Sequence, residues 1–151
     1  MWNQYQYFQT IITPDVFPAI GTVGRISGLM GMEEALENLR TIKPLMFFCE
    51  DDNDGYISLT QGNFDHSMHM FAILDVVKLG DSADRVRALN ACKAQGMKIL
   101  KKMLADSQDW GSTAYGFDRS RIDYQRIGPL VKNTWGYMFT YSMRNENFTL
   151  E

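Results

Sequence analysis

The middle of the chain carries its longest run of regularly spaced apolar residues. Between residues 82 and 104, apolar side chains recur at steps of three and four, which is the spacing of one face of an α-helix. The positions on this face are Val86, Leu89, Cys92, Gly96, Ile99 and Met103. Asp81 or Ser82 can cap the first turn. Because Gly96 adds no side chain to the apolar face, we expect the helix to lie close to a sheet there.

A period of two marks the end of the chain. From residue 131 to 143, aromatic residues alternate with small or polar ones, which predicts a strand with one buried face. Residues 122–127 predict a partner strand, joined to it by a turn at Gly128-Pro129. Residues 64–77 predict a third, longer strand whose apolar side chains concentrate toward its end.

The first half of the chain is less regular. Residues 21–40 have an apolar stripe that predicts a shorter helix, with the best periodicity from Met32 onward. Residues 45–49 are apolar throughout, as in a buried strand, and residues 56–59 have extended character. The acidic residues 51–55 between them predict a turn, so we expect these two strands to pair as a hairpin.

Taken together, the elements predict one domain over residues 1–151. Residues 1–20 are aromatic and polar and are interrupted by Pro14 and Pro18, which predicts an extended N-terminal arm. Residues 21–145 form the expected core. Its class is α+β: an antiparallel sheet with hairpins, one long helix packed on a face, and a shorter N-terminal helix.

Composition excludes several classes of protein. With 45% apolar and 22% charged residues the chain is globular, and a net charge of −3 gives no global attraction to nucleic acid or to an anionic membrane. No segment reaches the roughly 20 apolar residues of a membrane span, and the first residues do not resemble a signal peptide. Cys49 and Cys92 form no paired motif, which indicates buried free thiols. We therefore expect a cytoplasmic protein without a membrane partner.

One segment resembles an EF-hand calcium loop. With Gly55 as the sixth position, Asp52 and Asp54 stand at the third and fifth. Glu50 takes the first position, where aspartate is usual, and Gln61 takes the twelfth, where a bidentate glutamate completes the site. We therefore expect a solvated acidic turn that does not bind calcium tightly.

Two histidines are the remaining candidates for chemistry. His66 and His69 would share a face of a helix, but on the predicted strand they point to opposite faces, which argues against a metal site. An enzyme could still assemble a site from scattered residues such as Asp65, His66, His69 and Asp75, and a regulatory binding module is a further alternative. Because no catalytic motif or cofactor fingerprint occurs, we expect a protein that is not an enzyme and binds no cofactor.

The long helix is also rich in basic residues. These are Arg85, Arg87, Lys93, Lys98, Lys101 and Lys102. At about 100° per residue they spread around the solvent side of the helix, with no aromatic residues between them for stacking on bases. They indicate a solvated face, and we expect no contact with nucleic acid.

The order of elements resembles that of tail-terminator and tail-completion proteins of long-tailed bacteriophages. Three segments carry the resemblance, which covers residues 25–145: residues 45–50 after the first helix, the helix at 82–104, and the ending from 127–131 through 135–141. The resemblance implies a non-enzymatic protein of the phage or prophage virion. Such a protein forms a homo-oligomeric ring on the tail tube, stops tube growth and joins the tail to the head-connector proteins. It would be made in the host cytoplasm and become part of the virion.

A ring subunit needs surfaces that bind its neighbours, and aromatic side chains dominate such interfaces. The candidate interface residues are Trp2, Tyr5, Tyr7 and Phe8 of the arm, and Trp110, Tyr115 and Phe117 of the polar segment 105–121. The alternative is that these aromatic rings cover the protein's own sheet. If they are interface residues, a chain lacking residues 1–12 should still fold.

Overall fold

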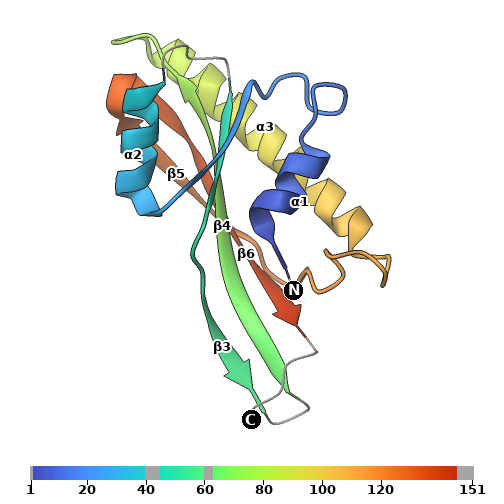
Figure 1. Cartoon of the computed structure of the whole chain (residues 1–151). Helices are drawn as coiled ribbons and strands as arrows, with labels where there is room; N and C mark the ends of the chain where they lie inside the picture. Colours follow the sequence, from blue (N-terminus) through green and yellow to red (C-terminus); the bar gives the residue numbers. More distant parts are fainter. Residues whose placement is uncertain (1, 40–44, 60–62, 146–151) are drawn as a thin grey trace.

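A computed structural model describes residues 2–39, 45–59 and 63–145 and confirms the α+β class (Figure 1). The helices are α1 (Gln4–Ile11), α2 (Gly28–Asn38) and α3 (Ser82–Asp106). The strands are β1 (Thr22–Ile26), β2 (Met46–Glu50), β3 (Asp54–Ser58), β4 (Phe64–Val76), β5 (Asp123–Leu130) and β6 (Thr134–Asn145). No helix among these residues is both long and apolar enough to cross a membrane.

The strands form one sheet in the order β1-β2-β4-β6-β5, in which only the β1–β2 pair is parallel. Its centre is the antiparallel pair β4–β6, which stays in register from Asp65 opposite Asn145 to Val76 opposite Thr134. The predicted long strand and the predicted aromatic strand are therefore the two central strands. The turn between β5 and β6 lies at Val131–Asn133, beyond the expected Gly128-Pro129.

The sequence predicted a hairpin between β2 and β3, and this prediction is wrong. β2 pairs with one end of β4, from Phe71 to Leu74, and β3 pairs with the other end, from Phe64 to Met68. Both strands lie along the same edge of β4. The acidic residues between them leave that edge, and the amide of Asp51 donates a hydrogen bond of 2.8 Å to Ile26 at the end of β1. β3 instead forms a hairpin with β4.

Helices cover both faces of the sheet. Figure 1 shows α1 and α3 on one side and α2 on the other. On the first side, Phe8 of α1 and Ile99 of α3 pack with Phe71 and Phe139 of the central strands. On the second side, residues of α2 pack on β2 and β4 in a separate cluster. That cluster includes Met32, Leu36, Met46 and Leu74.

α3 follows its prediction closely. The side chain of Asp81 caps the helix by accepting a hydrogen bond of 2.9 Å from the amide of Asp84. Cys92, Gly96, Ile99 and Met103 are buried as expected. A Cβ atom at Gly96 would collide with the ring of Phe139, so the close approach to the sheet is confirmed. Val86 does not belong to the buried face, because its side chain is 53% exposed.

The prediction of an extended arm at residues 1–20 is wrong for its first half. Residues 4–11 form α1, and Asn3 caps it by accepting a hydrogen bond of 3.0 Å from the amide of Gln6. Tyr7, Phe8 and Ile11 lie one helical turn apart or adjacent, and all three are buried against the sheet. Burial of this apolar face stabilises a helix that would be too short to form in isolation.

The helix expected over residues 21–40 is shorter than predicted. Residues 22–26 form β1, and α2 begins at Gly28. β1 is short and only Ile26 in it is fully buried, so it lacks the alternation of a strand with one covered face. At Gly24 the neighbouring ring of Phe48 occupies the space of a side chain.

Candidate protein-interaction surfaces

Four of the seven candidate interface aromatics are core residues. Phe8 is fully buried, and Trp2, Tyr7 and Phe117 are at most 8% exposed. The indole of Trp2 donates a hydrogen bond of 3.2 Å to the hydroxyl of Tyr141, which in turn donates one of 2.6 Å to Gln4. These four rings therefore cover the protein's own sheet, which was the alternative interpretation.

The other three aromatics remain accessible. Trp110 is 83% exposed and Tyr115 is 51% exposed, both in the segment that follows α3. Tyr5 is partly buried, and the guanidinium carbon of Arg25 lies 5.1 Å from the centre of its ring. The segment with Trp110 is held at its end by a β-bridge from Phe117 to Met143. Trp110 and Tyr115 are thus exposed rings on a segment that is fixed to the sheet.

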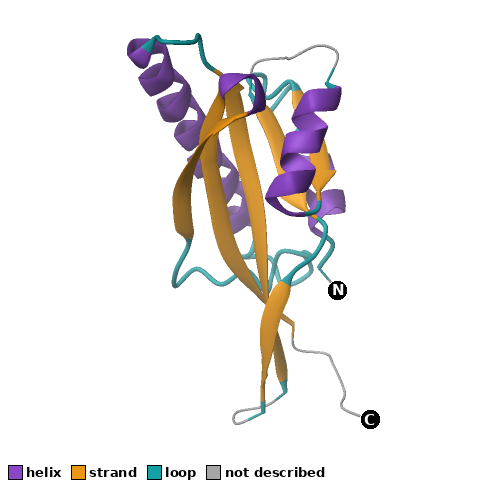
Figure 2. Ribbon diagram, turned by 90° about the vertical axis from the view of Figure 1, so that its left-hand side faces the viewer, coloured by secondary structure: helices purple, strands orange, loops and turns teal. Residues whose placement is uncertain are grey.

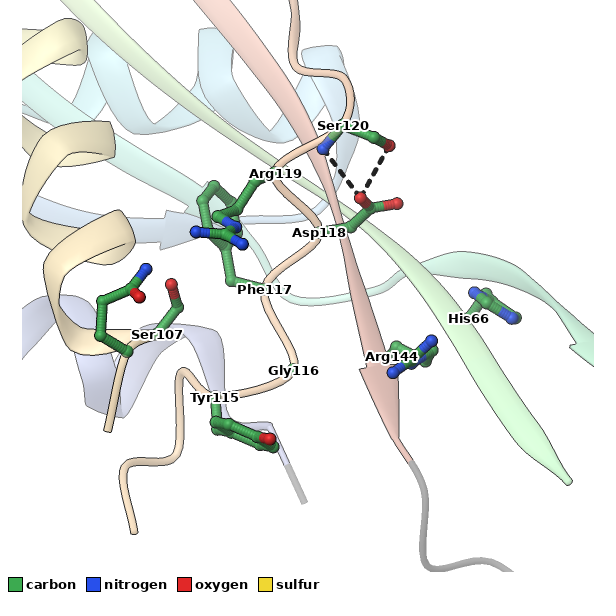
Figure 3. Close-up of a pocket in the computed structure, with 10 residues that line it drawn as sticks. His66, Ser107, Tyr115, Gly116, Phe117, Asp118, Arg119, Ser120 and Arg144 are labelled. Atoms are coloured by element: carbon green, nitrogen blue, oxygen red, sulfur yellow. Dashed lines mark hydrogen bonds between the residues drawn. The ribbon is translucent and has the colours of Figure 1, made fainter. Parts of the chain in front are cut away.

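A polar hollow of about 690 Å³ lies beside Tyr115 (Figure 3). It lies between the end of α3, residues 115–120, and the ends of β4 and β6. Its polar lining includes His66, Ser107, Asp118, Arg119, Ser120 and Arg144. Two arginines on its wall can attract an anionic group, such as a carboxylate on another protein.

Most polar side chains in this hollow already have partners within the chain. The amide and the hydroxyl of Ser120 donate to the carboxylate of Asp118 at 2.9 and 2.7 Å. These bonds lower the pKa of Asp118, and the nearby His66 and Arg144 lower it further. The ring of His66 stacks on Tyr56 at 4.4 Å between ring centres. Among the described residues, no hydroxyl here is hydrogen-bonded to this imidazole as a nucleophile would be to its base.

The scattered acids and histidines do not come together. His69 is buried, with its Nε2 atom 2.7 Å from the hydroxyl of Ser67, and burial lowers its pKa to about 4. Asp75 is buried further along β4, where its carboxylate lies 3.0 Å from the guanidinium of Arg87. Six residues of extended strand separate His69 and Asp75 by roughly 20 Å. His66 lies in the polar hollow, and Asp65 stands between Ile57 and Asn145 in the sheet.

The EF-hand-like segment connects two strands. Asp51 lies 3.6 Å from the guanidinium of Arg25, and Asp52 accepts a hydrogen bond of 3.3 Å from Ser27. Gln61 lies outside the described residues. Within the described part of the chain, no three His, Cys, Asp or Glu side chains are grouped closely enough to hold a metal ion.

The two cysteines are free and buried, as expected. Burial raises the pKa of both Cys49 and Cys92 to about 12. At neutral pH both thiols are therefore protonated and unreactive.

Two apolar surfaces were not anticipated from the sequence. The first, which we call the hairpin surface, lies on the β3–β4 hairpin that extends beyond the body of the protein in Figure 2. It consists of the exposed side chains Tyr56, Ile57, Leu59 and Met68. The second, which we call the α3–β5 groove, is a hollow of about 380 Å³ lined mainly by Met97, Leu100, Leu104, Phe117, Ile122, Tyr124 and Phe139.

A sequence signal existed for each surface. The hairpin surface combines apolar residues with a stretch that has no lysine or arginine from residue 51 to 69. On the long helix, Met97 and Leu104 lie seven residues apart and outside the predicted apolar stripe, so they share a second face.

A scan against models of known protein families finds no match to the chain, and no curated protein matches it in sequence.

Proposed function

We propose that this protein is a structural, non-enzymatic subunit of a phage or prophage tail. In this proposal it acts as a tail terminator or tail-completion protein, by ring self-association and by docking to tail-tube and head-connector proteins. It is made in the host cytoplasm and incorporated into the virion. Its partners are proteins, and it needs neither a cofactor nor contact with nucleic acid.

The observation that carries the proposal is the exposed hairpin surface. Tyr56, Ile57 and Leu59 are each more than half exposed on a hairpin that extends away from the helices. Exposed apolar residues grouped in this way are typical of protein–protein contacts. The tail assignment is supported by the resemblance in element order read from the sequence, which rests on the strand at Met46–Glu50, the long helix α3 and the closing β5–β6 hairpin.

The positions of the ionisable side chains favour this function over an enzyme. His66, His69 and Asp75, which an acid–base mechanism would have to bring together, lie at three separate places along β4. His69 and Asp75 are also engaged inside the protein, with Ser67 and Arg87 respectively.

Complementation of a phage that lacks this chain tests the proposal. A variant with both Trp110→Ala and Tyr115→Ala should fold normally, because both rings are exposed, but should yield far fewer complete particles. Leu79→Ala is the matched control, since Leu79 is 90% exposed in the turn before α3 and should support normal assembly. Full assembly with the double variant would contradict docking through these rings.

A further inference from the structure

The hairpin surface has two faces, because successive residues of a strand point to opposite sides. Ile57 lies on the acidic face, directly opposite Asp65, whereas Tyr56 and Met68 lie on the other face with His66 and Arg144. Tyr56 is 61% exposed, Ile57 52%, Leu59 56% and Met68 44%. From residue 51 to 69, every Asp, Glu, Lys or Arg is an aspartate: Asp51, Asp52, Asp54 and Asp65. Within the described residues β3 pairs only with β4, so the other edge of β3 has no strand beside it.

The rim of the α3–β5 groove carries the opposite charge, because its charged side chains are basic. Its exposed apolar side chains are Met97, Leu104 and Tyr124, at 54%, 40% and 52%. Lys101 and Arg119 also line it. Lys93 lies at the same rim, with its ammonium 4.3 Å from the centre of the Tyr124 ring. The groove is therefore an apolar hollow bordered by cations.

Another copy of the chain offers this groove both apolar side chains and an acidic face, through its hairpin surface. We propose that the hairpin surface of one copy docks into the α3–β5 groove of the next. Ile57 and Leu59 would then cover Met97 and Leu104, and Asp65, which lies opposite Ile57 on the same face, would face Lys101 and Arg119. Burying these apolar side chains supplies the affinity, and the opposite charges orient the two copies.

Such a contact determines the symmetry of the assembly. The two surfaces are different regions of the same chain, so each copy offers a free hairpin at one end and a free groove at the other. A head-to-tail contact of this kind closes into a ring when its rotation divides a full turn. The inference rests on the proposed function, because it names the surfaces through which the proposed ring would form.

Cross-linking between two single-cysteine variants tests this contact. Ile57→Cys and Met97→Cys are mixed in equal amounts and treated with a short bismaleimide reagent. The native thiols of Cys49 and Cys92 do not interfere, because they are buried and burial raises their pKa to about 12. We expect a covalent dimer that contains one copy of each variant.

Val86→Cys replaces Met97→Cys in the matched control. Val86 is 53% exposed on the same helix but does not line the groove, so this pair should give roughly tenfold less dimer. Equal yields from the two pairs, or no dimer from the groove pair, would overturn the proposal.

Charge exchange gives a second, independent measurement. Lys101→Glu with Arg119→Glu in the groove copy should weaken cross-linking roughly tenfold at low salt, since like charges then face each other. Asp65→Lys in the hairpin copy, on the same face as Ile57, should restore part of the yield, because opposite charges then face each other again. Failure of this rescue, with both variants folded by circular dichroism, would contradict the docking. The tail phenotype of a phage lacking the chain is scored separately, so loss of this contact and loss of the proposed function are distinguishable.

Discussion

At Gly96 the backbone of α3 lies against the ring of Phe139, and a side chain larger than hydrogen would collide with that ring. Phe139 cannot move away easily, because it stacks on Phe71 with 5.1 Å between ring centres. We predict that Gly96→Leu lowers the free energy of unfolding by about 1–3 kcal/mol, through overpacking. Urea denaturation of the two proteins measures this difference.

Gly31→Ala is the control for a helical glycine without such a neighbour. A Cβ atom at Gly31 would lie 3.8 Å from that of Ile26, which is an ordinary contact. This change should stabilise α2 by about 0.5–1 kcal/mol, because alanine loses less backbone entropy than glycine. If both substitutions stabilised the protein, the packing of α3 on β6 would be contradicted.

His69 should make stability depend on pH. Burial lowers its pKa from 6.5 to about 4 in the folded protein. Between these values the unfolded chain binds a proton at this histidine and the folded chain does not, so stability falls as the pH falls from 6.5 toward 4. The loss attributable to His69 should reach about 3 kcal/mol at most.

His69→Gln isolates this contribution. Glutamine does not titrate and can still bond to the hydroxyl of Ser67, so the variant should lose less stability over the same pH range than the wild type. Urea denaturation at several pH values measures both curves. Curves that run parallel would show that His69 does not have a lowered pKa.

Among the elements, α1 is the one whose role differs most from expectation. It places Phe8 against Phe47, with 4.8 Å between ring centres, and Tyr7 donates a hydrogen bond of 2.7 Å to Asp106 at the end of α3. We predict that Phe8→Ala lowers the free energy of unfolding by about 3–5 kcal/mol. We also expect a chain lacking residues 1–12 not to unfold cooperatively, in contrast to the expectation from sequence.

Val16→Ala is the control for this element, because Val16 is 46% exposed just beyond α1. Its effect should stay within about 0.5 kcal/mol. Thermal unfolding followed by circular dichroism compares the three proteins with the wild type. A truncated chain with the melting temperature of the full one would contradict the structural role of α1.

The elements that sequence predicted well are long. α3 and β6 each repeat their apolar pattern several times, and β4 carries a long run of apolar residues toward its end, so these patterns outweigh local irregularity. α1 was missed because polar residues interrupt it and its stability comes from packing on the sheet. The tertiary fold determines which strands pair with β1 and β3, and local sequence patterns do not specify these partners.

Tertiary packing also decides which of the candidate interface residues are exposed. Burial of Trp2, Tyr7 and Phe8 depends on the position of α1, whereas Trp110 and Tyr115 are exposed because their segment passes over the surface. The hairpin surface and the α3–β5 groove became visible only once β3 was placed along β4 and α3 was placed beside β5.

The protein combines a sheet covered by helices with a β3–β4 hairpin that projects from it (Figure 2). The helices α1, α2 and α3 bury both faces of the main sheet, while the β3–β4 hairpin extends beyond them (Figure 2). Its side chains Tyr56, Ile57 and Leu59 are more than half exposed. This arrangement suits a stable subunit whose projecting hairpin contacts a neighbouring protein. In the proposed ring the body of each copy supplies the groove and its hairpin reaches the neighbour.

We propose that this protein ends and completes a phage tail. Electron microscopy of particles from a phage lacking the chain tests this proposal, with tail length and head attachment scored for each particle. We expect tails of uncontrolled length without heads, and restored length and attachment when the wild-type chain is supplied. Tails of normal length joined to heads in its absence would contradict the proposal.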